Sequence, residues 1–520
     1  MSGNRSLVRA GTVVGAAAVA SRVLGFVRDV LMAQVLGTGA VADAFLVAFR
    51  IPNVVRRVLG EGGLNAGFVP LYGAMLARDG QAAARAFAGR AIGDAALLLL
   101  ALTAVAELLA GPLVFLFAAG FTEEGGKLAL AAFYTRLALP FIAFTGLASL
   151  LAALLNAHRY FTAAAVAPAL VNALLIVALL LADGDAAASP HAGADPQTGA
   201  WLAAAVSLSG LLHLAVVAWA VGRMPERPHL RRPARAGNAG GNGLGHLLRF
   251  ALPALVASAM TQVILLAATA LASAEPSAVS WLYYADRVFQ LPLSFIGVAA
   301  GVVLLPEFVG GRDARRDVAP ALTAFLTGAL ALALPAAAGL IALGPTVTAV
   351  LFERGAFTAA DSRQTSALLM ALATGLPAAA ASKVLIQPFF ASRRLATPFA
   401  AGIGGVAVTL AAARLTDIGT AASLGLWAQA LALGSGARRN ILWSRSFGVR
   451  IGGLTLAALA MGLMVATLDR LAAPWLAAEQ PFVLRAGVLT GLCLAGIAAY
   501  AALAAPLGGI RELVRGKGAR

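Results

Sequence analysis

The sequence predicts an all-α integral membrane protein that crosses the membrane about fourteen times. Of its 520 residues, 60% are hydrophobic and only 12% are charged, whereas about 25% charged residues is usual in soluble domains. Apolar stretches of roughly 20 residues, long enough to cross about 30 Å of hydrocarbon as a helix, recur along the whole chain. The basic residues gather in alternate connections between these stretches. Together these observations favour a multi-pass helical membrane protein.

The predicted spans follow one another with short connections. In chain order they cover residues 11–36, 43–70, 88–118, 130–155, 163–182, 199–221, 248–272, 279–306, 319–343, 363–391, 397–413, 419–442, 449–469 and 483–506. The first span carries Arg22 and Arg28 and has no small-residue cleavage site, so we expect it to be retained as a helix. The single cysteine, Cys493, lies in the last span, so the sequence offers neither a disulfide nor a thiolate metal site.

The formal net charge of +16 follows the loops rather than one continuous patch. With the N-terminus in the cytoplasm, most lysines and arginines fall on the cytoplasmic side, in residues 5–9, 78–90, 159, 223–249, 312–316, 393–394, 438–450 and the C-terminal tail. Cytoplasmic loops of membrane proteins carry such an excess of basic residues. The charge therefore predicts that both termini are cytoplasmic, and it does not indicate a nucleic-acid partner.

Residues 223–247 form the clearest hydrophilic break, rich in Pro, Gly and Arg. We therefore predict an N-terminal lobe of six helices (1–222), a cytoplasmic linker (223–247), a C-terminal lobe of six helices (248–442), and two further helices with a basic cytoplasmic tail (443–520). The lobes resemble each other at an offset of about 235 residues, which spans an even number of helices and makes the repeats parallel. The segment FTEEGGKLAL from Phe121 parallels FTAADSRQTS from Phe357, and Pro70 and Pro306 are both predicted to close the second helix of a lobe. Transporters with such repeats bind substrate between the halves and rock them for alternating access.

Several charged residues fall inside the predicted spans. They are Arg22, Arg28 and Asp29 in the first span, Asp43, Arg50, Arg56, Arg57 and Glu61 in the second, Asp286 and Arg287 in the eighth, and Lys383 in the tenth. An arginine or lysine facing lipid near the helix centre costs roughly 2.5 to 3.5 kcal/mol, so these residues should face water or one another. We predict a central cationic cavity.

A cationic cavity within the membrane calls for an anionic ligand. Arginine binds phosphate oxygens bidentately and stays charged, so Arg22, Arg28, Arg56 and Arg287 are suited to a pyrophosphate. The alternative is that the acids Asp29, Asp43, Glu61 and Asp286 simply neutralise neighbouring arginines in a packed network. The remaining charges, Arg50, Arg57 and Lys383, are candidate cavity or gating residues together with these four acids.

Three segments resemble the MurJ (MviN) family of lipid II flippases: SRVLGFVRDVLMA at residues 21–33, ADAFLVAFRIPNVVRRVLGEGGLNAGFVP at 42–70, and WLYYADRVFQLPLSFIGVAAGVVLLP at 281–306. The resemblance implies the fold of the multidrug/oligosaccharidyl-lipid/polysaccharide exporter superfamily, with two extra helices that form a hydrophobic groove. It implies movement of lipid II, the undecaprenyl-pyrophosphate-linked peptidoglycan precursor, from the inner to the outer leaflet of the bacterial cytoplasmic membrane. The family's essential cavity arginines match Arg22, Arg28, Arg56 and Arg287, and its conserved acids match Asp43 and Glu61. Asp29, Asp286 and Lys383 also match family positions.

The implied partners are lipid II and membrane lipids, with cell-wall synthesis or division proteins as further candidates; we expect a monomer and no cofactor. The predicted seventh, eleventh and twelfth helices hold no interior carboxylate, so we expect no metal site of the kind that some relatives form with sodium. Three other functions stay open. They are a flippase for another polyprenyl-pyrophosphate-linked glycan, a cation-coupled drug exporter, which would need an acidic cavity, and an enzyme acting on lipid II, for which no catalytic set is present.

Overall fold

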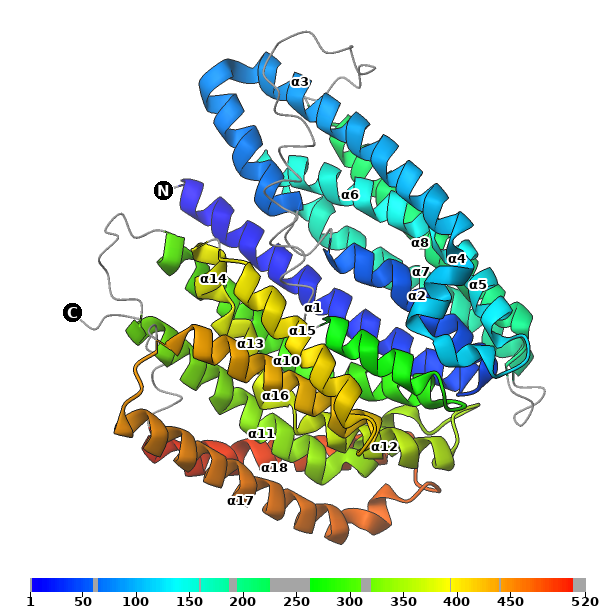
Figure 1. Cartoon of the computed structure of the whole chain (residues 1–520), viewed down its shortest axis with the longest axis vertical. Coiled ribbons are helices and arrows are strands. Elements are labelled where there is room, and N and C mark those ends of the chain that lie inside the picture. Colours follow the sequence, from blue (N-terminus) through cyan, green and yellow to red (C-terminus); the bar gives the residue numbers. More distant parts are fainter. Residues whose placement is uncertain are drawn as a thin grey trace. The chain divides into compact units, whose positions relative to one another are not determined.

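The computed structural model describes residues 2–58, 64–158, 160–186, 194–224, 262–309, 319–392, 394–438 and 441–507 (Figure 1). These residues form helices joined by turns, and their only β pairing is an isolated bridge between Arg354 and Phe357. The predicted all-α fold class is confirmed. Helices suit a chain that crosses lipid because they satisfy every backbone hydrogen bond within one segment.

The chain divides into two compact units. The first unit comprises Met1–Ala259 and Ser273–Ser280, and the second comprises Met260–Ala272 and Trp281–Arg520. The first contains α1 (Ser2–Leu36), α2 (Ala40–Val58), α3 (Leu64–Leu108), α4 (Ala110–Phe117), η2 (Ala119–Thr122), α5 (Lys127–Ala138), α6 (Pro140–Ala157), α7 (Phe161–Ala186) and α8 (Pro196–Gly222). The predicted four-part division stays a prediction, and most of the predicted linker, 223–247, lies outside the described residues.

The second unit contains the remaining helices. They are Gln262–Ala272, α10 (Ala278–Val309, whose first three residues belong to the first unit), α11 (Ala319–Phe352), α12 (Ala359–Ala373), α13 (Leu376–Leu385), α14 (Gln387–Ala391), α15 (Ala396–Ala412), α16 (Ile418–Gly436), α17 (Arg445–Leu476), α18 (Phe482–Ala504) and η4 (Ala505–Leu507). Within this unit α11 packs against α17, α12 and α13, and α18 packs against α17 and α11.

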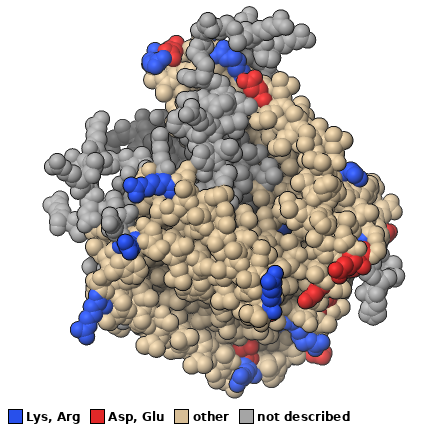
Figure 2. All heavy atoms as spheres, in the orientation of Figure 1, with Lys and Arg blue, Asp and Glu red and all other residues tan. Residues whose placement is uncertain are grey.

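Seven helices of the described part are long and apolar enough to cross a membrane. An eighth is added if the bent pair Ala359–Ala373 and Leu376–Phe390, with 44° between its halves, is one span. Every predicted span overlies one or more helices, apart from residues 59–63, 248–261 and 439–440, which lie outside the described residues. The count of fourteen stays a prediction. Figure 2 shows a face that is mostly uncharged, with the charged side chains in small groups chiefly toward its margins, as expected of a surface in contact with lipid.

The prediction that Pro70 and Pro306 close helices is wrong. Pro70 lies inside α3, and Pro306 lies inside α10, which continues to Val309. Membrane helices tolerate proline because neighbouring groups can satisfy the freed carbonyl, so a proline is a weak end signal here. The true break in α3 is Gly80, whose φ of 81° and ψ of 178° are not helical. At this residue α3 reverses direction, as the blue ribbon of Figure 1 shows.

The core of the first unit joins the two sides of the break in α3 to α6. Phe68, Tyr72 and Phe87 stack on one another from the two sides of Gly80, with ring centroids 5.7 and 5.8 Å apart. Tyr72 also bonds to His158 at the end of α6, with 2.7 Å between the tyrosine oxygen and Nε2. These contacts hold α3 against α6, and they leave the leucines of the long arm, such as Leu97 and Leu100, exposed for lipid.

Candidate functional site

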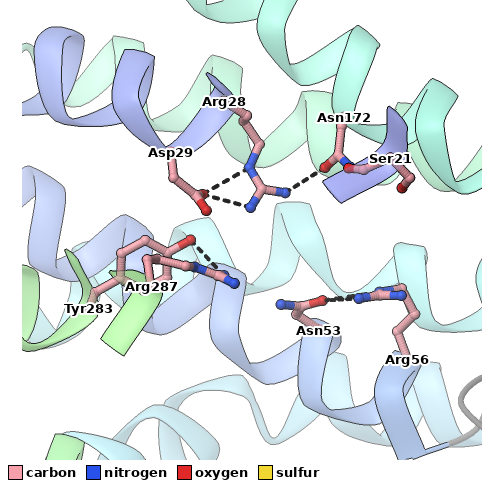
Figure 3. Close-up of polar contacts among 8 residues, drawn as sticks. All are labelled: Ser21, Arg28, Asp29, Asn53, Arg56, Asn172, Tyr283 and Arg287. Carbon is pink, nitrogen blue, oxygen red and sulfur yellow. Dashed lines mark hydrogen bonds and ion pairs between the residues drawn. The ribbon is translucent and has the colours of Figure 1, made fainter. Parts of the chain in front are cut away.

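Arg28 on α1 is the most enclosed of the predicted cavity arginines, with 7% of its surface exposed. Its Nε and Nη2 donate to Oδ1 of Asp29 at 3.1 and 2.6 Å, and its Nη1 donates to Oδ1 of Asn172 on α7 at 2.8 Å. Its guanidinium carbon also lies 5.1 Å from the ring centroid of Phe49 on α2. Figure 3 shows the side chain reaching from α1 to these polar partners. Three helices therefore fix one guanidinium within an apolar unit.

Asn172 connects the backbone of α1 to the Arg28 side chain. Its Nδ2 donates to the carbonyl of Ser21 at 2.9 Å, while its Oδ1 accepts from Arg28. Gly25 lies against this amide, and a methyl group there would make only ordinary van der Waals contact with Nδ2 of Asn172, at 3.4 Å. The amide thus sets the direction of Arg28 and ties α1 to α7, which pack closely.

The other predicted residues of the first unit are spread along α1 and α2. Arg56 donates from Nε and Nη2 to Oδ1 of Asn53, one turn earlier on α2, at 3.0 and 2.9 Å. Arg22 is exposed on α1, and Arg50 is half-buried on α2. The side chain of Arg57 and all of Glu61 lie outside the described residues.

In the second unit, the predicted residues of α10 are held by their own helix. Arg287 donates from Nη2 to the Tyr283 hydroxyl at 2.8 Å and lies over that ring, 4.7 Å from its centroid. Asp286 is buried and accepts from Nε2 of Gln290 at 2.6 Å. Lys383, on α13, is half-buried. Tyr283 and Gln290 therefore orient the two charges of α10 (Figure 3 for Tyr283 and Arg287).

Asp43 of α2 lies in a second polar cluster of the first unit and is fully buried. Its Oδ2 accepts from Nζ of Lys127, the first residue of α5, at 2.8 Å. The backbone amides of Ser277 and Ser280 donate to the same carboxylate at 3.1 and 2.8 Å, and the Ser280 hydroxyl donates as well. Lys127 also bonds to Glu124 at 3.0 Å. Asp43 therefore pairs with a cation and caps the start of α10.

Lys127 is a residue that the sequence analysis missed. It lies three residues before the predicted span 130–155, and the candidate charges were those inside the predicted spans. The available signal was the cost of a buried carboxylate: an acid in an apolar span needs a compensating cation, and Lys127 lies just before another predicted span. Its ammonium also lies 4.4 Å from the ring centroid of Phe121, which helps to shield the pair from water.

These contacts favour different interpretations at different residues. At Arg28 and Asp43, direct ion pairs agree with the alternative in which acids neutralise buried cations. Arg28 nevertheless retains donor capacity, because a guanidinium has five N–H groups and three of them are used in the bonds above. Among the described residues, no group of three or more His, Cys, Asp and Glu side chains is arranged to hold a metal ion. The chemistry that the arginines offer is reversible binding of an anion.

Comparison with known proteins places these residues in a family context. A family described as "Lipid II flippase MurJ" matches residues 32–484. A protein of Rhizobium meliloti named "Probable lipid II flippase MurJ" is 37% identical, over 97% of this chain and 94% of its own. The "Lipid II flippase MurJ" of Burkholderia cenocepacia is 32% identical, over 78% of this chain and 77% of its own. These matches confirm the resemblance carried by residues 21–33, 42–70 and 281–306.

Solved structures agree on the fold. A structure titled "Lipid II flippase MurJ, inward closed conformation" has a TM-score of 0.74 at 21% identity and covers 96% of this chain and 99% of its own. An inward-facing multidrug resistance MATE family transporter of the MOP superfamily has a TM-score of 0.62 at 16% identity, over 84% of this chain and 96% of its own. The predicted superfamily fold is therefore confirmed.

Proposed function

The chain belongs to the lipid II flippase MurJ family, and from that premise we propose that it moves lipid II from the inner to the outer leaflet of the bacterial cytoplasmic membrane. The family match spans most of the chain, so the proposal does not depend on one motif. Family membership also makes the protein a transporter rather than an enzyme. Lipid II is the proposed substrate, and one chain is the proposed working unit because it carries both units of the fold.

The observation that carries the proposal is the placement of Arg28. A guanidinium with 7% exposure, on an apolar helix, is held by Asp29, Asn172 and Phe49 and still has two N–H groups to donate. A buried cation of this kind is expensive to maintain and marks a functional site in a membrane protein. We assign Arg22, Arg28, Arg56 and Arg287 to the pyrophosphate, since arginine binds phosphate oxygens bidentately.

The second part of the proposal concerns motion and its driving force. Alternating access would expose the arginines first to the cytoplasm and then to the outside, as in other transporters built from repeats. An inside-negative potential favours outward movement of a bound anion by about 2.3 kcal/mol per charge and 100 mV. It also pulls the emptied cationic site back inward. The remaining charges, Asp29, Asp43, Arg50, Arg57, Glu61, Asp286 and Lys383, are proposed to hold or release the conformations of this cycle.

The proposed orientation places both termini in the cytoplasm, because the basic loops then face inside. On this orientation α11 and α17 end at the outer surface, and α12 and α18 begin there. Reporter fusions at the C-terminus test this orientation. Activity of a fused reporter enzyme that works only outside the cytoplasm would contradict the proposal.

The test of function is the amount of lipid II in the outer leaflet of cells whose own flippase is depleted and replaced by this chain. The intact chain is expected to restore it. Arg28→Ala is expected to abolish it, because the anion loses its buried donor, and Arg28→Lys should restore only part, since an ammonium lacks the planar fork.

Arg78→Ala is the matched control, since Arg78 is exposed on α3 and bonds only to its neighbour Asp79 among the described residues. It should transport as the intact chain does. All variants are compared at equal membrane abundance. Full transport by Arg28→Ala would contradict the role of Arg28, whereas failure of the well-expressed intact chain would favour another polyprenyl-pyrophosphate-linked glycan as substrate.

A further inference from the structure

Two arginines of the second unit meet at one end of α18, far along the chain from the residues assigned to transport. Arg354 lies in the tight turn between α11 and α12, and Arg485 lies in the second turn of α18. The guanidinium of Arg354 covers the ring of Phe482, the first residue of α18, 4.5 Å from its centroid. Phe482 and Arg485 are three residues apart and so share a face of α18. Arg354 therefore lies beside Arg485.

The turn holds Arg354 in a fixed position. Its backbone amide donates to the carbonyl of Phe352 at 2.7 Å, and its carbonyl accepts from the amide of Phe357 at 3.1 Å. Arg354 and Phe357 form the isolated bridge. Its Nη2 also donates to the carbonyl of Val350. Burial, and secondly the charge of Arg485, lower the pKa of Arg354 below its usual value. The guanidinium is thus preorganised next to a second positive charge.

Arg485 has no partner for its charge in the described part of the chain. Its exposure is 9%, and its Nε has no hydrogen-bond partner. The N-terminus of α18 adds partial positive charge from unsatisfied amides, which disfavours a cation in the first turns. A buried, uncompensated charge is destabilising, so this arrangement needs a compensating anion.

The neighbouring acids do not supply that anion. Asp469 of α17 accepts from the Thr346 hydroxyl at 2.7 Å, and Glu479 is exposed in the turn between α17 and α18. Glu353 precedes Arg354 directly. Among the described residues, no carboxylate lies within ion-pair distance of either Arg354 or Arg485.

We propose that Arg354, Arg485 and the N-terminus of α18 bind the phosphate group of an anionic membrane lipid. Guanidinium groups and helix N-termini are both established ligands for phosphate oxygens. The site uses none of the residues assigned to lipid II movement, so it can be tested independently of the proposed function. On the proposed orientation it faces the outer leaflet.

The surroundings favour a lipid over a soluble phosphate. Large apolar side chains are exposed at the same end of the unit. They are Trp475 in the last turn of α17 and Phe482 and Val483 in the first turn of α18. Aromatic side chains gather at the level of lipid headgroups, and guanidinium groups at that depth can bind the lipid phosphates. The two arginines would therefore contact the headgroup while these residues contact the acyl chains.

The experiment measures binding of short-chain phosphatidylglycerol to the purified full chain in neutral detergent. The comparison ligands are the matching phosphatidylcholine, which has no net charge, and inorganic phosphate. The variants are Arg485→Gln and Arg354→Gln, and the matched control is Arg470→Gln, an exposed arginine near the end of α17. Each of the two site variants is expected to weaken phosphatidylglycerol binding about tenfold, the effect of losing a hydrogen bond to a charged group.

Arg470→Gln should bind as the intact chain does, and phosphatidylcholine should bind more weakly than phosphatidylglycerol to the intact chain. If Arg485→Gln does not fold, Arg485→Lys is used, and it should bind measurably more weakly than wild type because the lysine lacks the bidentate fork. Unchanged binding by the site variants overturns the proposal. Equal weakening by Arg470→Gln also overturns it in favour of a diffuse surface charge, and displacement of the lipid by inorganic phosphate overturns the choice of a lipid.

Discussion

Each unit links two helices through an aspartate, but the residue at the start of the later helix is a lysine in the first unit and an aspartate in the second. In the first unit, the lysine that begins α5 donates to Asp43 on α2. In the second unit, Asp361 in the first turn of α12 accepts from the indole of Trp281 on α10 at 3.0 Å. Both helices follow a buried phenylalanine, Phe121 or Phe357, of the proposed repeat. An aspartate links the same kinds of helix in both units, but it sits on the earlier helix in one and on the later helix in the other.

The consequence lies in the partner that each aspartate has. Asp43 is buried with a full positive charge, whereas Asp361 is supported by its own helix, where it accepts from the amide and hydroxyl of Thr358 in a capping box. An acid that is stabilised locally depends less on a distant donor than one that is stabilised by a buried cation. We therefore expect the first link to be fragile and the second to be tolerant.

The largest effect is expected from Lys127→Met, which leaves Asp43 charged and buried without its cation. The free energy of unfolding should fall by roughly 3 to 5 kcal/mol, the usual cost of breaking a buried pair from one side. Equilibrium unfolding of the purified chain in mixed micelles measures it. The double variant Asp43→Asn/Lys127→Met should recover most of the loss, and wild-type stability of Lys127→Met would show that the pair contributes nothing.

Asp361→Ala should lower the free energy of unfolding by about 2 kcal/mol, because it removes both the cap of α12 and the acceptor of Trp281. Asp417→Ala is the matched control: Asp417 caps α16 through the amide and hydroxyl of Thr420 and is exposed. It should lose only about 1 kcal/mol. Equal losses in the same unfolding assay would mean that the bond from Trp281 adds no stability.

Trp281→Phe isolates the bond between helices, since it removes the indole donor and keeps an aromatic ring. The expected loss is about 1 kcal/mol, typical of one hydrogen bond. Trp427→Phe, which removes an exposed bond to the carbonyl of Thr374, is the control and should lose less. A larger loss in the control than in Trp281→Phe would reverse the ranking of the two sites.

The smallest effect is expected from Glu124→Gln. Glu124 is the second acid on Lys127, but its side chain is 31% exposed, and exposed ion pairs contribute about 0 to 1 kcal/mol. Its loss in the same assay should therefore be a fraction of that in Lys127→Met. A loss as large as that variant's would make Glu124, rather than Asp43, the principal partner of the lysine.

The sequence predicted the charged residues inside the apolar spans, but it did not predict the residues that pair with them. Arg28 and Asp43 stand out because a charge in an apolar span is expensive wherever it faces. Their partners Asn172 and Lys127 do not, since a neutral amide costs little in a helix and a lysine beside a predicted span looks like a loop charge. Which side chains pair across helices depends on how the helices pack, and a hydropathy pattern carries no information about packing.

Helix ends show the same limit. The spans that hydropathy predicted are mostly helical where they are described, and Gly80 lies in the predicted connection between the spans 43–70 and 88–118. The interruption at Leu139, inside the span 130–155, was not visible in the apolar pattern. Pro140 begins α6, where its missing N–H is no loss, whereas Pro70 lies inside α3. One residue type thus starts a helix in one context and is tolerated inside another, and tertiary contacts decide which.

The backbone conformation of Gly80 determines which substitutions this position can accept. A side chain at this position would meet no atom within 4 Å, so crowding places no limit on its replacement. The backbone does, because a φ of 81° with a ψ of 178° is a region open almost only to glycine. In a saturation library selected for growth, Gly80 should therefore reject small and large residues alike. Gly73, which also faces open space, should accept them readily. Natural variation at such a residue is limited by chirality rather than by volume.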